Sequence, residues 1–508
     1  MPARLLALVV VLASLALAVA APAQADLYFW DNYGGDPDSV GYTTSDGSAG
    51  GALNSSGVTV TGPEGMAIDT VTGRLYVASY NAGPGEEGQI QYINLDGSGG
   101  GVFTAPGAPV GEPMGVAVDP VGRMIYWTNT DGESISWARL DGSAGGSMNL
   151  TGAPVGQMYK IAIDPVNGKL YWFVQKESDN FIAYANLNNS GGGGTLDLTG
   201  APALLGTRAL AVDTVGGRVY WSDGTSKLFG FASVVGGGGG SVNLGGAYYT
   251  NSYGFAVDPT AGRLYWPNYD STTSRANGIG FASLTGGPGG NLTPPETSPW
   301  AGAQDLLVLK APTGTVAPAI TRAKNNRSQL ACSAGSWAAD FAGSYVYQAP
   351  TTTAYRWLRN GKAVAGATAT KLTAKSPGKY VCQVTGANQA GSTATSSKVA
   401  KVEASKAKLT TKKKVTVKAG GTATFAIKVN NLGDLKSKNA KLCALLPKAA
   451  KGFLKPSKCK SLGRLKGKGK KSAKLKITAL PAASGVYSVS FKLKGVAGKP
   501  AKAKIVVR

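Results

Sequence analysis

The chain has 508 residues and carries a formal net charge of +24, with 4 Cys and no His. A chain of this length is expected to fold as several domains. Because histidine is absent, the sequence excludes Ser-His-Asp and Cys-His nucleophiles, His-ligated zinc and His general-base chemistry. An active site would have to use carboxylates, Lys, Tyr or an oxygen-ligated metal, so the composition argues against an enzyme.

The positive charge is divided unevenly along the chain. Residues 26–315 carry 12 Lys/Arg against 25 Asp/Glu, residues 316–400 carry 10 against 1, and residues 401–508 carry 29 against 2. An acidic part therefore precedes a strongly basic part. Such an asymmetry bears on solubility and on charged partners, and the fold cannot be inferred from it.

Residues 1–25 have the pattern of a secretory signal peptide. Arg4 precedes an apolar run from Leu5 to Ala21, and Ala23-Gln-Ala25 offers a small-residue cleavage site. No second apolar run of this kind follows. The sequence therefore predicts a secreted or cell-surface associated, extracellular protein with no transmembrane segment after signal cleavage.

One motif recurs along the first half of the chain. In the copy Gly115–Trp127, Val-Ala-Val precedes Asp-Pro-Val-Gly-Arg and then Ile-Tyr-Trp. The aspartates that open the turn are spaced 50, 45, 49 and 45 residues apart: Asp69, Asp119, Asp164, Asp213 and Asp258. A fixed period in this range indicates a propeller or solenoid array. We expect each aspartate to cap its own hairpin turn rather than to join a ring of catalytic carboxylates.

Each period predicts four short strands, which make one propeller blade. The Tyr that marks the second strand occurs six times: Tyr28, Tyr76, Tyr126, Tyr171, Tyr220 and Tyr265. The first unit lacks its leading strand, and a matching strand, Asp305–Leu309, follows the sixth unit. We therefore predict a six-bladed β-propeller over residues 26–315, closed by pairing of this late strand into blade one.

These residues resemble the low-density-lipoprotein-receptor class B repeats, also called YWTD repeats. The resemblance rests on Ala-Val-Asp-Pro-x-x-Gly-x-Ile-Tyr-Trp and a downstream Leu-Asp-Gly-Ser. It implies a six-bladed ring that binds other molecules. The last motif positions differ, as in Trp172-Phe173, and the EGF-like modules that accompany these repeats in receptors are missing from the sequence. Receptor biology is therefore not implied.

Two β-sandwich domains are predicted after the propeller, which makes the chain all-β. Over residues 316–402, Cys332, Trp357 and Tyr380-Val-Cys382 have the order and spacing of an immunoglobulin-like sandwich, and the segment resembles Ig-like modules of bacterial exported proteins. Residues 405–508 keep period-two alternation with Lys at the outward positions. This last segment resembles the CARDB-like β-sandwich modules of bacterial surfaces.

All four cysteines follow the propeller. Four cysteines allow three pairings, and export to an oxidising compartment favours disulfides. The spacing favours Cys332–Cys382 and Cys443–Cys459, one bridge in each sandwich.

One stretch is a candidate for metal binding. Asp31, Asp36 and Asp38 place oxygen ligands at short spacing in a loop that contains Gly, which is the ligand type that calcium uses. The EF-hand frame is missing, so a solvated acidic loop is the alternative. Calcium at this loop is the one cofactor considered, and otherwise none is expected.

Two further sets of residues are candidates for binding. Residues that vary between blades form a candidate surface on the ring: Glu64, Tyr80, Glu112, Trp137, Tyr253 and Tyr269. A basic run in the last domain offers contacts for a polyanion: Lys466, Lys468, Lys470 and Lys471. The run lacks aromatic residues for base stacking, so no specific nucleic acid is expected, and a Lys-covered sandwich without a partner is the alternative.

The sequence favours an extracellular binding or adhesion protein. The propeller would take a protein, peptide or carbohydrate ligand, and the basic domain would face an anionic cell-wall polymer. One alternative is a secreted lactonase- or glycosidase-like enzyme that uses carboxylates or calcium. Glu64 and Glu112 precede their inner strands by similar spacing, and their placement opposite each other across the axis would favour this alternative. The other alternative is a purely structural surface protein.

Overall fold

The computed structural model describes residues 26–34, 38–81, 88–177, 179–268, 278–295 and 302–508, so the predicted signal peptide lies outside it. Two compact units are formed. Unit 1 contains Met1–Thr313, Trp337–Thr352 and Gly386–Thr393, and unit 2 contains Gly314–Ser336, Thr353–Thr385 and Ala394–Arg508. In the described part of the chain, no helix has the length and apolar character needed to cross a bilayer.

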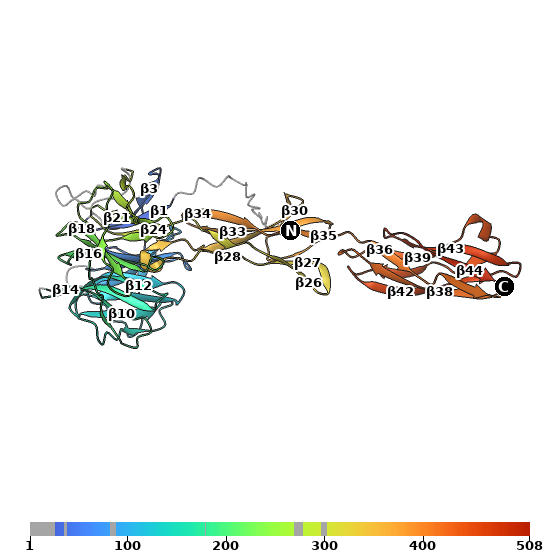
Figure 1. Cartoon of the computed structure of the whole chain (residues 1–508), viewed down its shortest axis with the longest axis horizontal. Helices are drawn as coiled ribbons and strands as arrows, with labels where there is room; N and C mark the ends of the chain where they lie inside the picture. Colours follow the sequence, from blue (N-terminus) through green and yellow to red (C-terminus); the bar gives the residue numbers. More distant parts are fainter. Residues whose placement is uncertain (1–25, 35–37, 82–87, 178, 269–277, 296–301) are drawn as a thin grey trace, which may run out of the picture. The chain divides into compact units, whose positions relative to one another are not determined.

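Unit 1 is a six-bladed β-propeller whose blades are antiparallel sheets (Figure 1). Blades two to six each take four consecutive strands. Blade two has β4 (Pro63–Asp69), β5 (Arg74–Ser79), β6 (Gln89–Asn94) and β7 (Gly100–Phe103), and blade three has β8 (Pro113–Asp119), β9 (Met124–Asn129), β10 (Ser134–Arg139) and β11 (Gly145–Ser147). Blade four has β12 (Gln157–Asp164), β13 (Lys169–Lys176), β14 (Asp179–Asn186) and β15 (Gly194–Thr195), blade five has β16 (Thr207–Asp213), β17 (Arg218–Asp223), β18 (Leu228–Ser233) and β19 (Gly240–Ser241), and blade six has β20 (Ala256–Asp258), β21 (Arg263–Pro267), β22 (Ile279–Ser283) and β23 (Gly290–Leu292). In blades two to six the Val-Ala-Val type strand comes first, and it lies innermost, where it contacts the first strands of the neighbouring blades.

Blade one closes the ring. β24 (Ala303–Leu309) pairs antiparallel with β1 (Leu27–Asn32), and Leu27 lies opposite Leu309. β2 (Ser39–Thr44) and β3 (Gly50–Ala52) complete the blade. The predicted closure is therefore confirmed, and neither β1 nor β24 is left as an open sheet edge.

The indole rings of the Tyr-Trp strands are buried in the propeller: Trp127, Trp172, Trp221 and Trp266. A Cβ atom at Gly230 or Gly280 would overlap the ring of Trp221 or Trp266 on the neighbouring strand. Glycine at these two positions makes room for the indole. The buried tryptophans therefore pack within and between blades and do not present a sugar-stacking surface.

The carboxylates that open the blade turns accept hydrogen bonds from their own turns. Asp119 Oδ1 accepts from the main-chain N–H groups of Val121 and Gly122, and Asp213 Oδ1 accepts in the same way from Val215 and Gly216. These are the bonds of a turn cap, as the sequence predicts.

A segment from the middle of the chain lies at the propeller axis. β29 (Val346–Tyr347) pairs in parallel with β24, and the 3-10 helix η1 (Ala342–Ser344) contacts the inner strands β8, β12, β16 and β20. Ser344 Oγ donates to the carbonyl of Val212, and the hydroxyl of Tyr345 donates to the carbonyl of Ile161. Residues 342–347, which the sequence assigns to the Ig-like segment, thus pack against the inner strands of the propeller.

Two β-sandwiches follow the propeller. The strands of the first are β25 (Gly314–Val316) with β28 (Ser336–Trp337); β26 (Ile320–Ala323), β27 (Asn326–Cys332) and β32 (Lys371–Thr373); and β31 (Lys362–Ala363), β30 (Thr352–Arg359), β33 (Gly378–Asn388), β34 (Gly391–Ser396) and β35 (Ala400–Val402). The strands of the second are β36 (Ala407–Thr410), β38 (Thr422–Asn431), β42 (Lys470–Ala479) and β40 (Leu454–Pro456) in one sheet, and β37 (Lys414–Val417), β44 (Ala501–Val507), β43 (Gly485–Lys494), β39 (Asn439–Leu445) and β41 (Lys460–Arg464) in the other. A 3-10 helix, η2 (Lys448–Ala450), follows β39.

Both predicted disulfides are confirmed. Cys332–Cys382 joins β27 to β33, and Cys443–Cys459 joins β39 to the segment before β41. In the first sandwich Trp357 is buried and its Nε1 donates to the carbonyl of Ala369 at 2.8 Å. The Tyr380 hydroxyl donates to the carbonyl of Ser376 at 2.7 Å, so this hydroxyl ties a turn just before the second Cys.

Ring closure generates the first testable prediction. Leu307 of β24 is fully buried, so Leu307→Lys places an unpaired charge in the closing blade. We expect the free energy of unfolding to fall by more than about 3 kcal/mol. The measurement is urea unfolding of the mature protein followed by tryptophan fluorescence.

The matched control is Val121→Lys, at a turn residue that is 86% exposed. This substitution is expected to change stability by no more than about 0.5 kcal/mol. An equal loss of stability in the two variants would contradict the closing role of β24.

Candidate functional site

An ion pair spans the propeller axis. Lys160 on β12 and Asp305 on β24 are 7% and 4% exposed, and Nζ lies 3.8 Å from Oδ2. The ammonium also donates to the main-chain oxygen of Glu64 on β4. Because β12 belongs to blade four and β24 to blade one, the pair joins blades on opposite sides of the ring.

A second carboxyl lies beside this pair. Asp31 is fully buried, and its Oδ1 accepts from the N–H groups of Gln304 at 2.7 Å and Asp305 at 2.5 Å. Burial raises the pKa of Asp31 and of Asp305, and the charge of Lys160 offsets part of each shift. Two buried carboxyl groups thus share one lysine as their positive neighbour. Because one ammonium balances only one carboxylate, the arrangement favours the protonated form of the other carboxyl group. The cluster lies inside the ring, where it links strands of different blades and so has a structural role.

The two glutamates that the enzyme alternative singles out lie on neighbouring blades. Glu64 is the second residue of β4 and Glu112 directly precedes β8, and β4 and β8 are adjacent inner strands. Glu112 Oε2 accepts a hydrogen bond from the hydroxyl of Tyr80 at 3.1 Å. Glu64 and Glu112 therefore do not face each other across the axis, which is the placement that would favour a catalytic acid pair.

These glutamates belong to a half-buried group that we call the rim cluster: Glu64, Tyr80, Glu112 and Tyr159. Desolvation and the hydrogen bond to Glu112 raise the pKa of Tyr80, with smaller contributions from the charges of Glu64 and Tyr159. The Tyr159 hydroxyl donates to Gln157 Oε1 at 3.0 Å and is 3.2 Å from Gln175 Oε1. Aromatic rings and hydrogen-bonding groups are therefore presented together where the inner strands begin.

Trp137, which the sequence suggested as a surface residue, occupies a repeated packing position. It pairs with Tyr126 and Gly146, as Tyr92 of blade two pairs with Tyr76 and Gly101. Its indole Nε1 is buried without a hydrogen-bond partner in the described structure. Comparison between blades of the third strand would have found this repeat, so Trp137 is left out of the rim cluster.

Two other candidates from the sequence are Tyr253 and Tyr269. Tyr253 is half-buried and lies three residues before the start of β20, and its hydroxyl accepts from Asn251 Nδ2 at 3.2 Å. Tyr269 lies outside the described residues.

The acidic loop suggested for calcium is separated into different environments. Asp31 is held in β1 as described above, whereas Asp38 accepts from the N–H groups of Gly34 and Gly62, both at 2.8 Å. Asp36 lies outside the described residues. Across the described ranges, no group of three or more Cys, Asp or Glu side chains is arranged to hold a metal. Calcium at this loop stays a prediction.

The lysines suggested for polyanion contact differ in their surroundings. Lys466 and Lys470 are exposed. Lys468 Nζ lies 3.3 Å from Glu403 Oε2 and also donates to the carbonyl of Leu432, and Lys471 donates to the carbonyl of Leu462. Two of the four ammonium groups are therefore already engaged within the domain.

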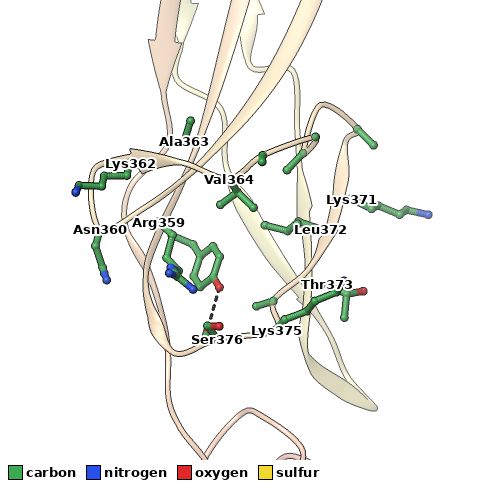
Figure 2. Close-up of a pocket in the computed structure, with 16 residues that line it drawn as sticks. Arg359, Asn360, Lys362, Ala363, Val364, Lys371, Leu372, Thr373, Lys375 and Ser376 are labelled. Carbon is green, nitrogen blue, oxygen red and sulfur yellow. Dashed lines mark hydrogen bonds between the residues drawn. The ribbon is translucent and has the colours of Figure 1, made fainter. Parts of the chain in front are cut away.

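A cavity of about 740 Å³ in the first sandwich is lined by sixteen residues between Arg359 and Tyr380. Figure 2 shows Lys362 and Lys371 pointing away from it and Ser376 at its lower end. The carbonyl of Ser376 accepts a hydrogen bond from the Tyr380 hydroxyl. Five of its sixteen lining residues are alanine, and its charged residues are all basic. This hollow is a feature of the sandwich corner rather than a site with convergent chemistry.

No protein-family model matches the chain, and no curated protein matches it. Solved structures similar to it include a Nidogen/Laminin complex, with 18% identity over 56% of this chain and 98% of that chain and a TM-score of 0.43. A protein from Lactobacillus plantarum has 13% identity over 56% of this chain and 100% of its own, with a TM-score of 0.39. A "putative 6-phosphogluconolactonase" from Bacteroides uniformis has 12% identity over the same shares and a TM-score of 0.38. At these values neither laminin binding nor lactone hydrolysis passes to this chain.

The axial cluster predicts a specific dependence of stability on pH. A carboxyl whose pKa is raised in the folded state contributes full stability below its ordinary pKa of about 4 and loses it as the pH rises through the raised value. Because burial raises the pKa of Asp31, Asp31→Asn is expected to reduce the loss of stability above pH ~4. The measurement is the free energy of unfolding between acid and neutral pH.

The control is Asp46→Asn. Hydrogen bonds from Thr44 and Ser48 lower the pKa of Asp46 to about 2. The contribution of Asp46 to the free energy of unfolding therefore changes below the ordinary carboxyl pKa and not above it. An unchanged slope above pH ~4 in the Asp31→Asn variant would contradict the assignment of a raised pKa.

Proposed function

We propose that the chain is an exported bacterial binding or adhesion protein and that the rim cluster is its ligand platform. The observation that carries this proposal is the filled axis. η1 and β29 occupy it near the blade turns, and Lys160 with Asp305 crosses it nearer the rim. A ligand would therefore bind to the rim of the propeller, where the inner strands begin. There Tyr80 and Tyr159 supply amphipathic side chains of the kind that is enriched in binding surfaces.

The enzyme alternative receives less support from the same geometry. The histidine-free chain needs converging carboxylates, yet Glu64 and Glu112 lie on neighbouring blades and Glu112 is hydrogen-bonded to Tyr80. The carboxyl groups with raised pKa values, Asp31 and Asp305, are buried at the axis. A substrate would have no access to them without opening the ring.

The two sandwiches support an extracellular setting. The Cys332–Cys382 bridge, the buried Trp357 and the Tyr380 hydrogen bond are features of an Ig-like module. Alternating outward lysines in the second sandwich fit a CARDB-like module that faces an anionic cell-wall polymer. Disulfides persist in oxidising compartments, and two of them in one chain support export.

Ligand binding by the rim is tested with the mature protein on arrays of extracellular proteins, peptides and carbohydrates. For a ligand that binds saturably, the double substitution Tyr80→Ala and Tyr159→Ala is expected to weaken binding at least tenfold, on the order of the loss at an aromatic hot spot. The control is Val166→Ala, at an exposed turn residue at the opposite end of an inner strand. Absence of any saturable ligand would count against the platform.

Wall association is tested by retention on isolated Gram-positive-type cell walls. The mature protein is compared with a form that lacks residues 405–508, across a series of salt concentrations. Because exposed lysines bind polyanions by releasing counterions, retention of the full form is expected to fall steeply with salt, and the truncated form should not be retained. Retention of both forms at equal levels would exclude the basic domain as the wall contact.

A further inference from the structure

The second sandwich has a hollow with a basic wall, which we call the basic cleft. It has a volume of about 740 Å³ and lies over the outward face of β37, β44 and β43 and the end of β39. Four exposed lysines line it: Lys413, Lys414, Lys502 and Lys504. Leu445 and Pro447 provide an exposed apolar side, and Ser488 and Ser490 provide hydroxyl groups.

The strand register brings these charges together. Lys414 lies directly beside Lys504 in the parallel pair β37–β44, and the main-chain N–H of Lys504 donates to the carbonyl of Lys413. Lys502 and Lys504 are two residues apart and so project from the same face, about 7 Å apart, while adjacent strands lie about 5 Å apart. Like charges placed directly opposite each other destabilise a sheet. The arrangement therefore carries a cost in the absence of an anion.

The domain itself supplies no carboxylate to this cleft. Residues 401–508 contain two acidic residues, Glu403 and Asp434. Glu403 lies within ion-pair distance of Lys401 and Lys468, and Asp434 lies near Arg322, Arg327 and Lys468. Within the described part of the chain, no carboxylate lies within ion-pair distance of a cleft lysine. This distinguishes the cleft from the run at 466–471, where Lys468 already has acidic neighbours.

We propose that the basic cleft binds a linear polymer of polyol units joined by phosphodiesters. Each phosphate keeps its negative charge throughout the physiological pH range, and lysine binds phosphate as a point charge. Ser488 and Ser490 can donate to phosphate oxygens, and Leu445 and Pro447 can contact the carbon chain between phosphates. The inference rests on the proposed wall-facing role of the basic domain and assigns that role to specific residues.

The experiment compares two variants of the mature, full-length chain that change the net charge equally. The cleft variant carries Lys→Gln at Lys413, Lys414, Lys502 and Lys504. The control variant carries Lys→Gln at four exposed lysines on the outward face of the opposite sheet: Lys408, Lys428, Lys474 and Lys476. The probe is a synthetic poly(glycerol phosphate) of defined length, and its dissociation constant is measured by calorimetry at several salt concentrations.

We expect the cleft variant to bind the probe at least about tenfold more weakly with a smaller salt dependence, and the control variant to stay within about twofold of the unmodified protein. Replacement of the four cleft lysines by Arg, which keeps the charge, should restore binding. Circular dichroism and melting curves check that each variant is folded.

Other outcomes separate this inference from the proposed function. Equal weakening in both variants would overturn the cleft and leave attraction by the whole basic domain. Inorganic phosphate can be tested as a competitor of the probe. If it displaced the probe as effectively, per phosphate group, as the free polymer does, the cleft would be a site for single anions and the proposal of a polymer ligand would be wrong. Stronger binding of a polyuronate would overturn the phosphate assignment. If the unmodified protein bound none of these polyanions, both the cleft and the wall-facing role would be wrong.

Discussion

The pairing of β24 with β1 is the interaction on which the propeller depends. It joins residues that are separated by the whole length of the ring, and it places Leu306, Leu307 and Val308 in the core. Each blade buries its faces against its neighbours, so an unclosed ring would expose two apolar surfaces as well as two sheet edges. Closure also fixes Asp305, which lies in the same strand, next to the axis.

The filled axis sets what the ring can do. Lys160 reaches Asp305 across it, Asp31 lies beside the pair, and Ser344 and Tyr345 bond to inner-strand carbonyls from within the ring. A buried ion pair contributes less to stability than its charges suggest, because both ions lose their hydration. It does fix which blades meet, since any other partner would leave a buried charge unpaired. The ring is thus organised as a rigid support for its outer surface.

The charge division gives the two halves of the chain different kinds of surface. The rim cluster combines tyrosines with glutamates, which suits ligands recognised by hydrogen bonds and aromatic contact. The second sandwich has 29 Lys/Arg against 2 Asp/Glu over residues 401–508, and both acids lie among Arg and Lys partners at one place. The exposed lysines without an acidic partner, such as Lys414 and Lys504, attract counterions, so association with an anionic polymer would release those ions.

The sequence by itself determined the propeller, the blade number, the strand that closes the ring and both disulfides. Each of these leaves a local or periodic signal: the Asp-Pro-x-x-Gly turn, six Tyr-bearing strands, an extra strand and paired cysteines. Only the tertiary structure decided that Tyr345 bonds to Ile161 inside the ring, that Lys160 meets Asp305 and that Lys414 lies beside Lys504. These contacts join residues 90 or more positions apart whose identities have no period, so nothing in the local pattern specifies them. Trp137 is a residue whose repeated role was hidden in the sequence. It differs in type from its counterparts in other blades, but the strand register shows that it occupies a packing position repeated between blades.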